Sequence, residues 1–454
     1  MQVIKKILIH IFNNTSLYFF VFLAIFTIDR HHRYEATTNP DLGPFESDVA
    51  KYYSYLPNLF YCSSDEIAQN FSNNKTTIGM AIMYSPAFLA GQIIAEQTGQ
   101  ERNGYSEPYQ WAIRWESILI CFAALIFCRK SLLFFFRDTV VLISLSCILF
   151  GTNLFYYTYS NGEMPHCYLF FLYSAFIFIS LQLILKKKYR NVLWLGLIGG
   201  MITLIRPTDA LIFLFPLLFK TNTIKELKNR VVTFLKHPYY LSFSLILFLI
   251  PLVVQMLLWK KYSGHYIFYS YNNERFFFND PQIINFLFSF RKGWLVYTPI
   301  MFFSLIGIIL SKKYLKDYFV FLIIFTISNI YILSCWWDWA FGGSFGCRAL
   351  IQSYAVLIFP FALFISWCFK FFEKRKVIKF IFRILLITIL FLLIRLNLFQ
   401  TWQYKYLIIH WSGMNEKYYK YVFLNERLTN DEIIYIHSIA TPPDPEKMMK
   451  GERD

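Results

Sequence analysis

Long apolar runs separated by short polar connections fill most of this sequence. Several runs reach or exceed the roughly 18–20 residues that an α-helix needs to cross a bilayer. The runs expected to cross are 7–28, 109–127, 140–157, 167–185, 192–205, 210–219, 239–259, 294–310, 318–335, 350–369 and 378–398. The pattern predicts an all-α polytopic membrane protein. The first run is expected to stay uncleaved, because no small-residue cleavage pattern follows it before Asp29.

One further apolar run, 78–95, is not expected to cross. Loops rich in Lys and Arg stay in the cytoplasm, and the basic clusters of this chain share one side only if this run does not cross. The clusters are 5–6, 129–130, 186–190, 220–230, 312–313 and 374–376. The run contains Pro86 and Gly91, which suit a re-entrant or surface helix. We therefore expect about eleven membrane-spanning helices, with juxtamembrane helices in the first outer loop.

This topology places the polar and aromatic loops on one outer face. The loops are 29–77, 152–166, 206–209, 260–293 and 336–348. Residues 1–400 are then one membrane-embedded domain, and residues 401–454 are a short extracytoplasmic tail. Adaptable loops often share a face in membrane proteins, but loops gathered over a helix bundle are also where a site at the interface is built.

The first outer loop contains an amphipathic stretch with two carboxylates, Glu46 and Asp48. Ser47 is a good N-cap, and Asp48 then falls in the first turn, where the helix dipole favours negative charge. An apolar face follows at positions i, i+3, i+4 and i+7, namely Val49, Tyr52, Tyr53 and Leu56. Pro57 is expected to kink or end the helix. The stretch is interpreted as a helix on the membrane surface; the alternative is an ordinary capped loop helix whose acid serves only the dipole.

Composition and charge agree with a membrane location. The chain is 56% hydrophobic and only 16% charged, against roughly 25% charged residues in soluble domains. The formal net charge of +16 arises from Lys and Arg in short loops, so it indicates cytoplasmic loops and not nucleic-acid binding. The eight cysteines form no CxxC pair and no metal-binding spacing.

Later outer loops supply further candidates for binding and chemistry. Glu163 and His166 lie at the mouth of a predicted span, and Arg206 lies between two runs. Arg291 and Lys292 end the long loop. The alternatives are structural: a buried histidine is often only a satisfied polar residue, and an arginine at a helix end often snorkels or forms a salt bridge.

The stretch 335–348 alternates indoles with a Gly-rich turn and closes on Arg348. It contains Trp336, Trp337 and Asp338. Indole rings suit both sugar faces and membrane interfaces, so an interfacial aromatic belt is the alternative interpretation. An arginine fork suits phosphate, because its planar guanidinium donates two parallel hydrogen bonds.

Together these pieces resemble the GT-C superfamily of membrane glycosyltransferases, near the protein O-mannosyltransferases and the lipid A aminoarabinose transferases. The stretch 47–53 resembles the family's first-loop motif, with Asp48 in the position of its acid. Glu163 is the nearest match to the functional residue of the second outer loop, and 336–348 resembles a late Gly-rich loop. The paired Asp-Glu of some members is absent, because Val49 follows Asp48. Which of Glu46 and Asp48 acts therefore stays open.

The resemblance implies an inverting transfer of a sugar from a polyprenyl-phosphate donor to an acceptor hydroxyl on a glycan, lipid or protein. Asp48 would be the general base, with Glu163 as a second catalytic residue. Arg206, Arg291, Lys292 and Arg348 would neutralise the leaving phosphate. The remaining substrate contacts would come from Glu46, Tyr52, His166, Trp336, Trp337 and Asp338.

The implied setting is a bacterial inner membrane with the active site on the extracytoplasmic side. The sequence shows no nucleotide-binding motif and requires no cofactor, while a divalent metal on the carboxylates stays open. The main alternative is a transporter or flippase for a lipid-linked glycan. Transporters place ionisable residues on broken helices near the bilayer midplane. The predicted spans look nearly free of charge, which favours the enzyme.

Overall fold

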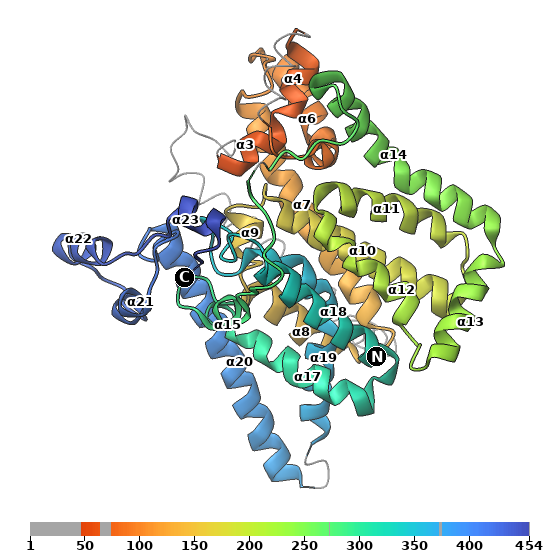
Figure 1. The fold of residues 1–454 in the computed structure, drawn as a ribbon. Coiled ribbons are helices and arrows are strands. Elements are labelled where there is room, and N and C mark those ends of the chain that lie inside the picture. The colour runs from red at the N-terminus through yellow and green to blue at the C-terminus, as the bar shows by residue number, and fades with distance from the viewer. Residues whose placement is uncertain (1–46, 64–73, 272, 372–374, 454) are drawn as a thin grey trace, which may run out of the picture. The chain divides into compact units, whose positions relative to one another are not determined.

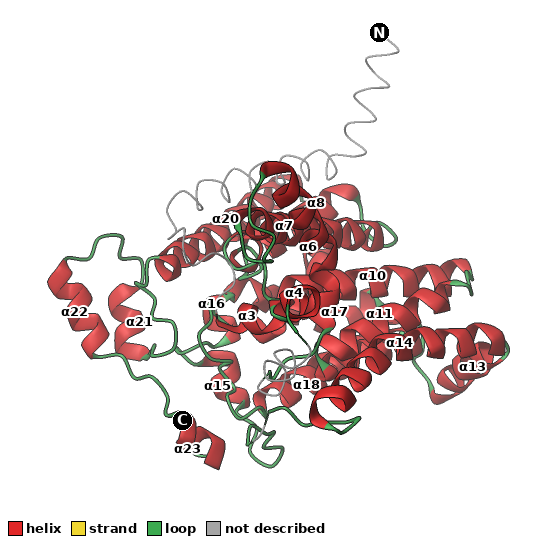
Figure 2. Ribbon diagram, turned by 90° about the horizontal axis from the view of Figure 1, so that it is seen from above, coloured by secondary structure: helices red, strands yellow, loops and turns green. Residues whose placement is uncertain are grey.

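The computed structural model describes residues 47–63, 74–271, 273–371 and 375–453. Every named element in these ranges is a helix, as Figures 1 and 2 show. Its one isolated β-bridge pairs Phe276 with Trp336. The predicted span 7–28 and the candidate acid Glu46 lie outside the described residues.

The chain divides into two compact units. Of the described residues, unit 1 contains 132–156, 273–371 and 375–453, and unit 2 contains 47–63, 74–131 and 157–271. The short helix α9 (Tyr156–Tyr159) begins where the chain passes from unit 1 into unit 2.

Unit 2 pairs a set of long apolar helices with the helices formed by the described residues between 47 and 98. Its helices are α3 (Ser47–Tyr53), α4 (Tyr55–Tyr61), α6 (Gly79–Thr98), α7 (Glu107–Leu132), α10 (Pro165–Lys186), α11 (Asn191–Ile205), η1 (Pro207–Phe213), α12 (Leu214–Leu218), α13 (Ile224–Leu235) and α14 (Pro238–Ser263). Helix α11 packs against both α10 and α14, while α3 and α4 pack against α6.

Small residues allow the closest helix pair of unit 2. On α11, a Cβ atom added at Gly196 would overlap the carbonyl oxygen of Ser244, and one at Gly200 would overlap that of Phe248. These two glycines are four residues apart and so lie on one face of the helix. Such spacing lets the backbones of two membrane helices approach.

Unit 1 is built around a buried helix. Its helices are α8 (Asp138–Phe150), α15 (Ile283–Phe288), α16 (Trp294–Tyr297), η2 (Pro299–Met301), α17 (Phe302–Tyr314), α18 (Lys316–Ser334), η3 (Arg348–Ser353), α19 (Tyr354–Lys370), α20 (Lys376–Lys405), α21 (Glu416–Val422), α22 (Asn430–Ser438) and α23 (Pro445–Lys450). Helix α19 packs against α8 and α17. Gly307 of α17 permits this, since a Cβ atom there would overlap the carbonyl oxygen of Pro360.

Six of the described helical segments are long and apolar enough to cross a membrane. They are α7, α10, α14, α18, the segment Arg348–Lys370 and α20. The most apolar window of Arg348–Lys370 is 94% buried, whereas those of α14 and α20 are only 11% buried. Helices this apolar and this exposed require an apolar surrounding such as lipid. The chain is therefore an integral membrane protein in character.

Other predicted runs form shorter helices. Helices α8 and α11 and the segment Pro207–Leu218 are apolar but shorter than a full span. Helix α6 covers the run that was expected not to cross, and it is not among the six. The run 294–310 is not one continuous helix, because it divides into α16, η2 and α17 around Pro299. Proline lacks the N–H that would continue the helical ladder.

The amphipathic stretch of the first outer loop is helical, but its predicted end is wrong. It forms α3 and α4 with a break at Ser54, and Pro57 lies inside α4. A proline in the first turn of a helix is tolerated, because the N–H it lacks has no partner there. The predicted face is largely buried: Val49, Tyr53 and Leu56 are each at most 5% exposed.

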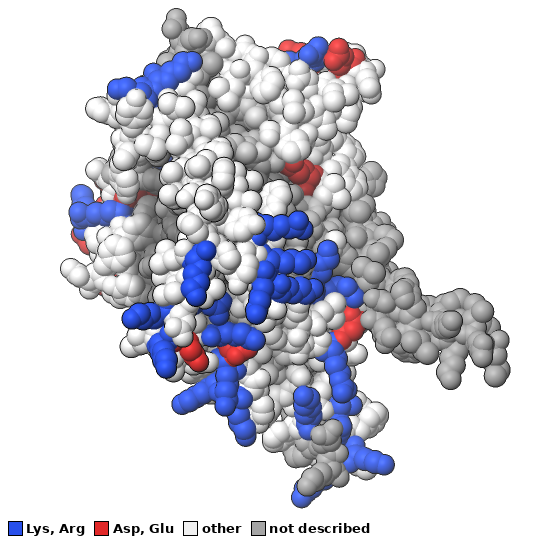
Figure 3. Space-filling view, turned by 90° about the vertical axis from the view of Figure 1, so that its right-hand side faces the viewer, with Lys and Arg blue, Asp and Glu red and all other residues white. Residues whose placement is uncertain are grey.

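A basic amphipathic helix, α13, connects two apolar segments of unit 2. Thr223 and Glu226 form a capping box at its start. None of its residues is buried. Figure 3 looks onto the side of the molecule where Figure 1 places α13, and Lys and Arg far outnumber Asp and Glu there. This is the composition expected of a cytoplasmic connection.

Candidate functional site

Asp48 is an accessible carboxylate at the start of α3. Its side chain is 39% exposed, and its Oδ1 atom lies 3.8 Å from Nζ of Lys51 in an i, i+3 ion pair. An exposed pair of this kind contributes little to stability. The α3 backbone is fixed from below, because Asn74 donates a 2.8 Å hydrogen bond to the carbonyl of Lys51. Asp48 is thus held in place by its helix, with its side chain partly exposed.

Glu163, the candidate of the second outer loop, is buried. Its side chain is 7% exposed, and its Oε1 lies 3.9 Å from Nε of Arg114 on α7. Its backbone carbonyl accepts a hydrogen bond from the hydroxyl of Tyr84 on α6. Glu163 is therefore held in place by two contacts with other helices, and its carboxylate is paired inside the protein. A buried ion pair needs good geometry to offset the cost of its desolvation.

A second carboxylate, Glu116, lies on α7 two residues after Arg114. The hydroxyl of Tyr168 on α10 donates a 3.1 Å hydrogen bond to its Oε2 atom. Tyr84 packs edge-on against Tyr168, with 5.3 Å between ring centroids. We call Tyr84, Arg114, Glu116, Glu163 and Tyr168 the acid cluster of unit 2.

Sequence reasoning missed Arg114 and Glu116. Both lie inside the predicted span 109–127 and within the candidate span α7. The statement that the spans are nearly free of charge is therefore wrong for this helix. The sequence itself shows Arg114 and Glu116 two residues apart inside an apolar run. An ionisable residue inside a membrane span indicates a functional site by default.

His166 and Arg206 both belong to unit 2. Helix α10 begins at Pro165, a favoured first position, and this places the buried His166 ring edge-on to Tyr157 with centroids 5.3 Å apart. Arg206 is half-buried between α11 and η1. Thr77 donates a 2.7 Å hydrogen bond to the carbonyl of Leu204, so the first outer loop reaches the end of α11 near Arg206.

Three cationic side chains gather in unit 1. The charges of Arg291 and Arg348 both act on Lys292 and on Asp338. Lys292 is 2% exposed and donates a hydrogen bond to the carbonyl of Ser344. We call Arg291, Lys292, Asp338 and Arg348 the cationic cluster; its local charge balance is positive and favours an anion such as a phosphate group.

Burial sets the protonation of this cluster. Removal from water lowers the pKa of Lys292 to about 7, and the charges of Arg348 and Arg291 act in the same direction, while Asp338 opposes them. Burial also raises the pKa of Asp338 above its ordinary value, against the backbone N–H groups of Gly342 and Ala340 and the two guanidinium groups. An anion bound here would stabilise the charged form of Lys292.

Gly342 is required at the turn that carries Asp338. Its φ of +63° lies in the left-handed region, which residues with a side chain rarely adopt. A Cβ atom at Gly342 would also lie 3.6 Å from Oδ2 of Asp338 and 3.9 Å from Nη2 of Arg348. The glycine therefore leaves the space beside both charged groups open.

Buried polar atoms around the cluster lack hydrogen-bond partners among the residues that the structure describes. They are Oδ1 of Asp338 and the Nε1 atoms of Trp294, Trp337 and Trp339. The guanidinium of Arg291 lies 5.9 Å from the ring centroid of Trp339. Unsatisfied buried groups are rare in native proteins and call for a water, an ion or a ligand. The Nε1 donor of the partly exposed Trp337 is thus available to a polar ligand.

The C-terminal segment holds the start of the Trp-rich loop. The side chain of Arg453 is fully buried and donates 3.2 Å hydrogen bonds to the carbonyls of Cys335 and Trp336 and a 2.8 Å one to Asp280. Its guanidinium lies 4.6 Å from the ring centroid of Phe277. The segment predicted as a tail therefore supports the loop, which sequence reasoning did not foresee.

Metal sites, disulfides and known relatives would also indicate the chemistry. Within the described ranges, no three His, Cys, Asp or Glu side chains come close enough together to hold a metal ion. The eight cysteines are free thiols. Comparison of the sequence with models of known protein families and with curated proteins finds no match.

Proposed function

We propose that this chain is an inverting glycosyltransferase of a bacterial inner membrane. It moves a sugar from a polyprenyl-phosphate donor to an acceptor hydroxyl on the extracytoplasmic side, and about eleven helices cross the bilayer. The observation that carries the proposal is the cationic cluster, in which Arg291, Lys292 and Arg348 act on Asp338 in a buried setting.

The cluster suits the leaving group of such a reaction. A lipid phosphate is already a weak base, so its departure requires neutralised charge and no strong acid. Preorganised cations and N–H donors in a partly dry site supply this stabilisation. The partly exposed indoles of Trp336 and Trp337 offer surface for a sugar ring, and Nε1 of Trp337 is a donor for its hydroxyls.

Asp48 is the proposed general base for proton removal from the acceptor hydroxyl. Asp48 is exposed and lies at a helix N-terminus, where negative charge is favoured. A general base must be within hydrogen-bond reach of the proton it takes, which an exposed side chain allows. Glu163 suits a supporting role better, because its carboxylate is buried against Arg114.

The test is release of polyprenyl phosphate from a sugar-charged lipid by purified, reconstituted protein. Arg348→Ala and Lys292→Ala should each lower donor use about tenfold to a hundredfold, the worth of a charge-assisted contact to phosphate. Lys313→Ala is the control, because this basic residue lies at the end of α17, outside the cluster. Equal small losses in all three variants would mean that the phosphate binds elsewhere.

One observation favours the rival transporter. Arg114 and Glu116 lie within the first half of the candidate span α7, and ionisable residues inside spans are typical of transporters. Against this, Arg114 already pairs with Glu163, and Glu116 already accepts from Tyr168. A liposome assay that follows the intact donor across the bilayer separates the two functions.

A further inference from the structure

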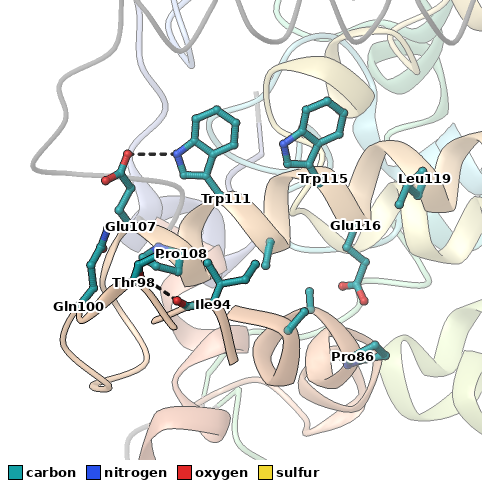
Figure 4. A pocket seen from close by; sticks show the side chains of 13 residues that line it. Pro86, Ile94, Thr98, Gln100, Glu107, Pro108, Trp111, Trp115, Glu116 and Leu119 are labelled. Atoms are coloured by element: carbon teal, nitrogen blue, oxygen red, sulfur yellow. Dashed lines mark hydrogen bonds between the residues drawn. The ribbon is translucent and has the colours of Figure 1, made fainter. Parts of the chain in front are cut away.

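A groove of about 700 Å³ lies between α6 and α7 in unit 2. Its α6 side is made of small residues, including Pro86 and Ala90, and its α7 side includes Ala112 and the indoles of Trp111 and Trp115. Figure 4 shows the two indoles following one another along α7. We call this cavity the α6–α7 groove; its volume is within the range of ordinary ligand sites.

The groove is long, has a mostly apolar lining, and is open along a candidate membrane span. Its lining on α7 runs from Glu107 to Leu119, which corresponds to about 18 Å of helix. Most of the lining is apolar. The carboxylate of Glu107 is engaged by Nε1 of Trp111 at 3.2 Å. An aliphatic chain matches both the length and the apolar lining of this groove.

Glu116 gives the groove one polar end. In Figure 4 its carboxylate extends from α7 toward α6, near Pro86. It accepts a hydrogen bond from the Tyr168 hydroxyl. A carboxylate has about four acceptor positions, so room remains for another donor. The Tyr168 donor is neutral, and a second neutral hydroxyl extends the same pattern without burying another charge.

We propose that the α6–α7 groove binds a single-chain lipid alcohol, with its aliphatic chain between the helices and its hydroxyl donating to Glu116. The site stands apart from glycosyl transfer and does not depend on it. A fatty acid is disfavoured because its carboxylate would face that of Glu116, and a plain hydrocarbon lacks the donor.

Photolabelling tests this site without an activity assay. Reconstituted full-length protein is irradiated with a diazirine derivative of hexadecanol, and labelled peptides are identified by mass spectrometry. We expect labels within residues 107–119, and we expect excess hexadecanol to remove them at about one tenth of the concentration needed with palmitate or hexadecane. Equal competition by all three compounds, or labels outside the lining of the groove, would overturn the proposal.

Two variants of α7 sharpen the test. Ala112→Leu fills the groove and should lower labelling about tenfold, whereas Ala123→Leu, outside the lining on the same helix, should leave it unchanged. In Glu116→Gln the diazirine probe should still label the groove, but palmitate should now compete with it at concentrations closer to those of hexadecanol. Undiminished labelling of Ala112→Leu would contradict the site; if that variant fails to fold, the competition series on the unchanged protein still decides.

Discussion

At the scale of single residues, three carboxylates of unit 2 differ in their surroundings. Asp48 is exposed beside Lys51, Glu163 is buried against Arg114, and Glu116 accepts from Tyr168. Asp48 has the exposure that a base for an incoming acceptor needs, whereas the buried Glu163 does not. Environment, more than residue type, therefore divides the roles.

Asp48→Asn should abolish sugar transfer while folding and membrane insertion stay normal. The amide keeps the shape but cannot take a proton, and loss of a general base removes about 10²–10⁴ in rate. Glu163→Gln should cost less, since this carboxylate is held by Arg114. The measurement is transfer by reconstituted protein at matched expression, with Glu46→Gln as comparison. Normal turnover in Asp48→Asn and loss in Glu46→Gln would identify the other carboxylate as the base.

Lys292 makes donor binding depend on pH. Its pKa is about 7, so the cationic form that attracts phosphate is lost as pH rises above 7. The donor KM should therefore increase above pH 7, by up to about tenfold per pH unit. The increase should level off above the higher pKa that Lys292 has when phosphate is bound to it. Lys292→Arg keeps the charge and should flatten the profile. A KM independent of pH in the unchanged protein would show that Lys292 does not meet the donor.

The same shift affects stability with a definite sign. A folded pKa below the ordinary value means that the unfolded chain binds the proton more tightly. Charged Lys292 thus destabilises the empty fold below pH 7, and the penalty is relieved as pH rises from about 7 toward the ordinary lysine pKa.

At the scale of helices, close packing at glycine determines which elements pair. In unit 1 the α17–α19 contact depends on Gly307 against the backbone of Pro360. Added volume in a tight contact costs about 1–3 kcal/mol. Gly307→Ala should therefore lower the melting temperature in detergent, whereas Ile309→Ala, at a site 74% exposed on the same helix, should change it much less. Equal melting temperatures for Gly307→Ala and the parent would exclude a packing role.

The sequence predicted helices well and their contacts poorly. Hydrophobic runs report burial locally, so α7, α10, α14, α18, α19 and α20 fall on predicted runs. The break at Pro299 was missed because the surrounding run is uniformly apolar. Arg114 and Glu116 were overlooked for the same reason, and their partners Glu163 and Tyr168 come from other helices. The support that Arg453 gives to Trp336 is a contact between distant segments, which no local pattern encodes.

At the scale of the whole molecule, an apolar helical chain of membrane character carries charged side chains that are unusual inside it. Helices α14 and α20 present apolar surface that only lipid covers favourably. The cationic cluster of unit 1 and the acid cluster of unit 2 each remove charge from water, which is costly without function or compensation. For the cationic cluster, binding of a phosphate group would supply that compensation.

The most direct test follows the fate of the donor in sealed liposomes that contain the purified protein. Polyprenyl-phosphate sugar is supplied in one leaflet, and the donor, polyprenyl phosphate and glycosylated acceptor are quantified by mass spectrometry on each side. The account predicts that donor is consumed, that polyprenyl phosphate and glycosylated product appear in equal amounts, and that Arg348→Ala suppresses both. Intact donor arriving in the opposite leaflet, with no polyprenyl phosphate released, would contradict a glycosyltransferase and establish a flippase instead.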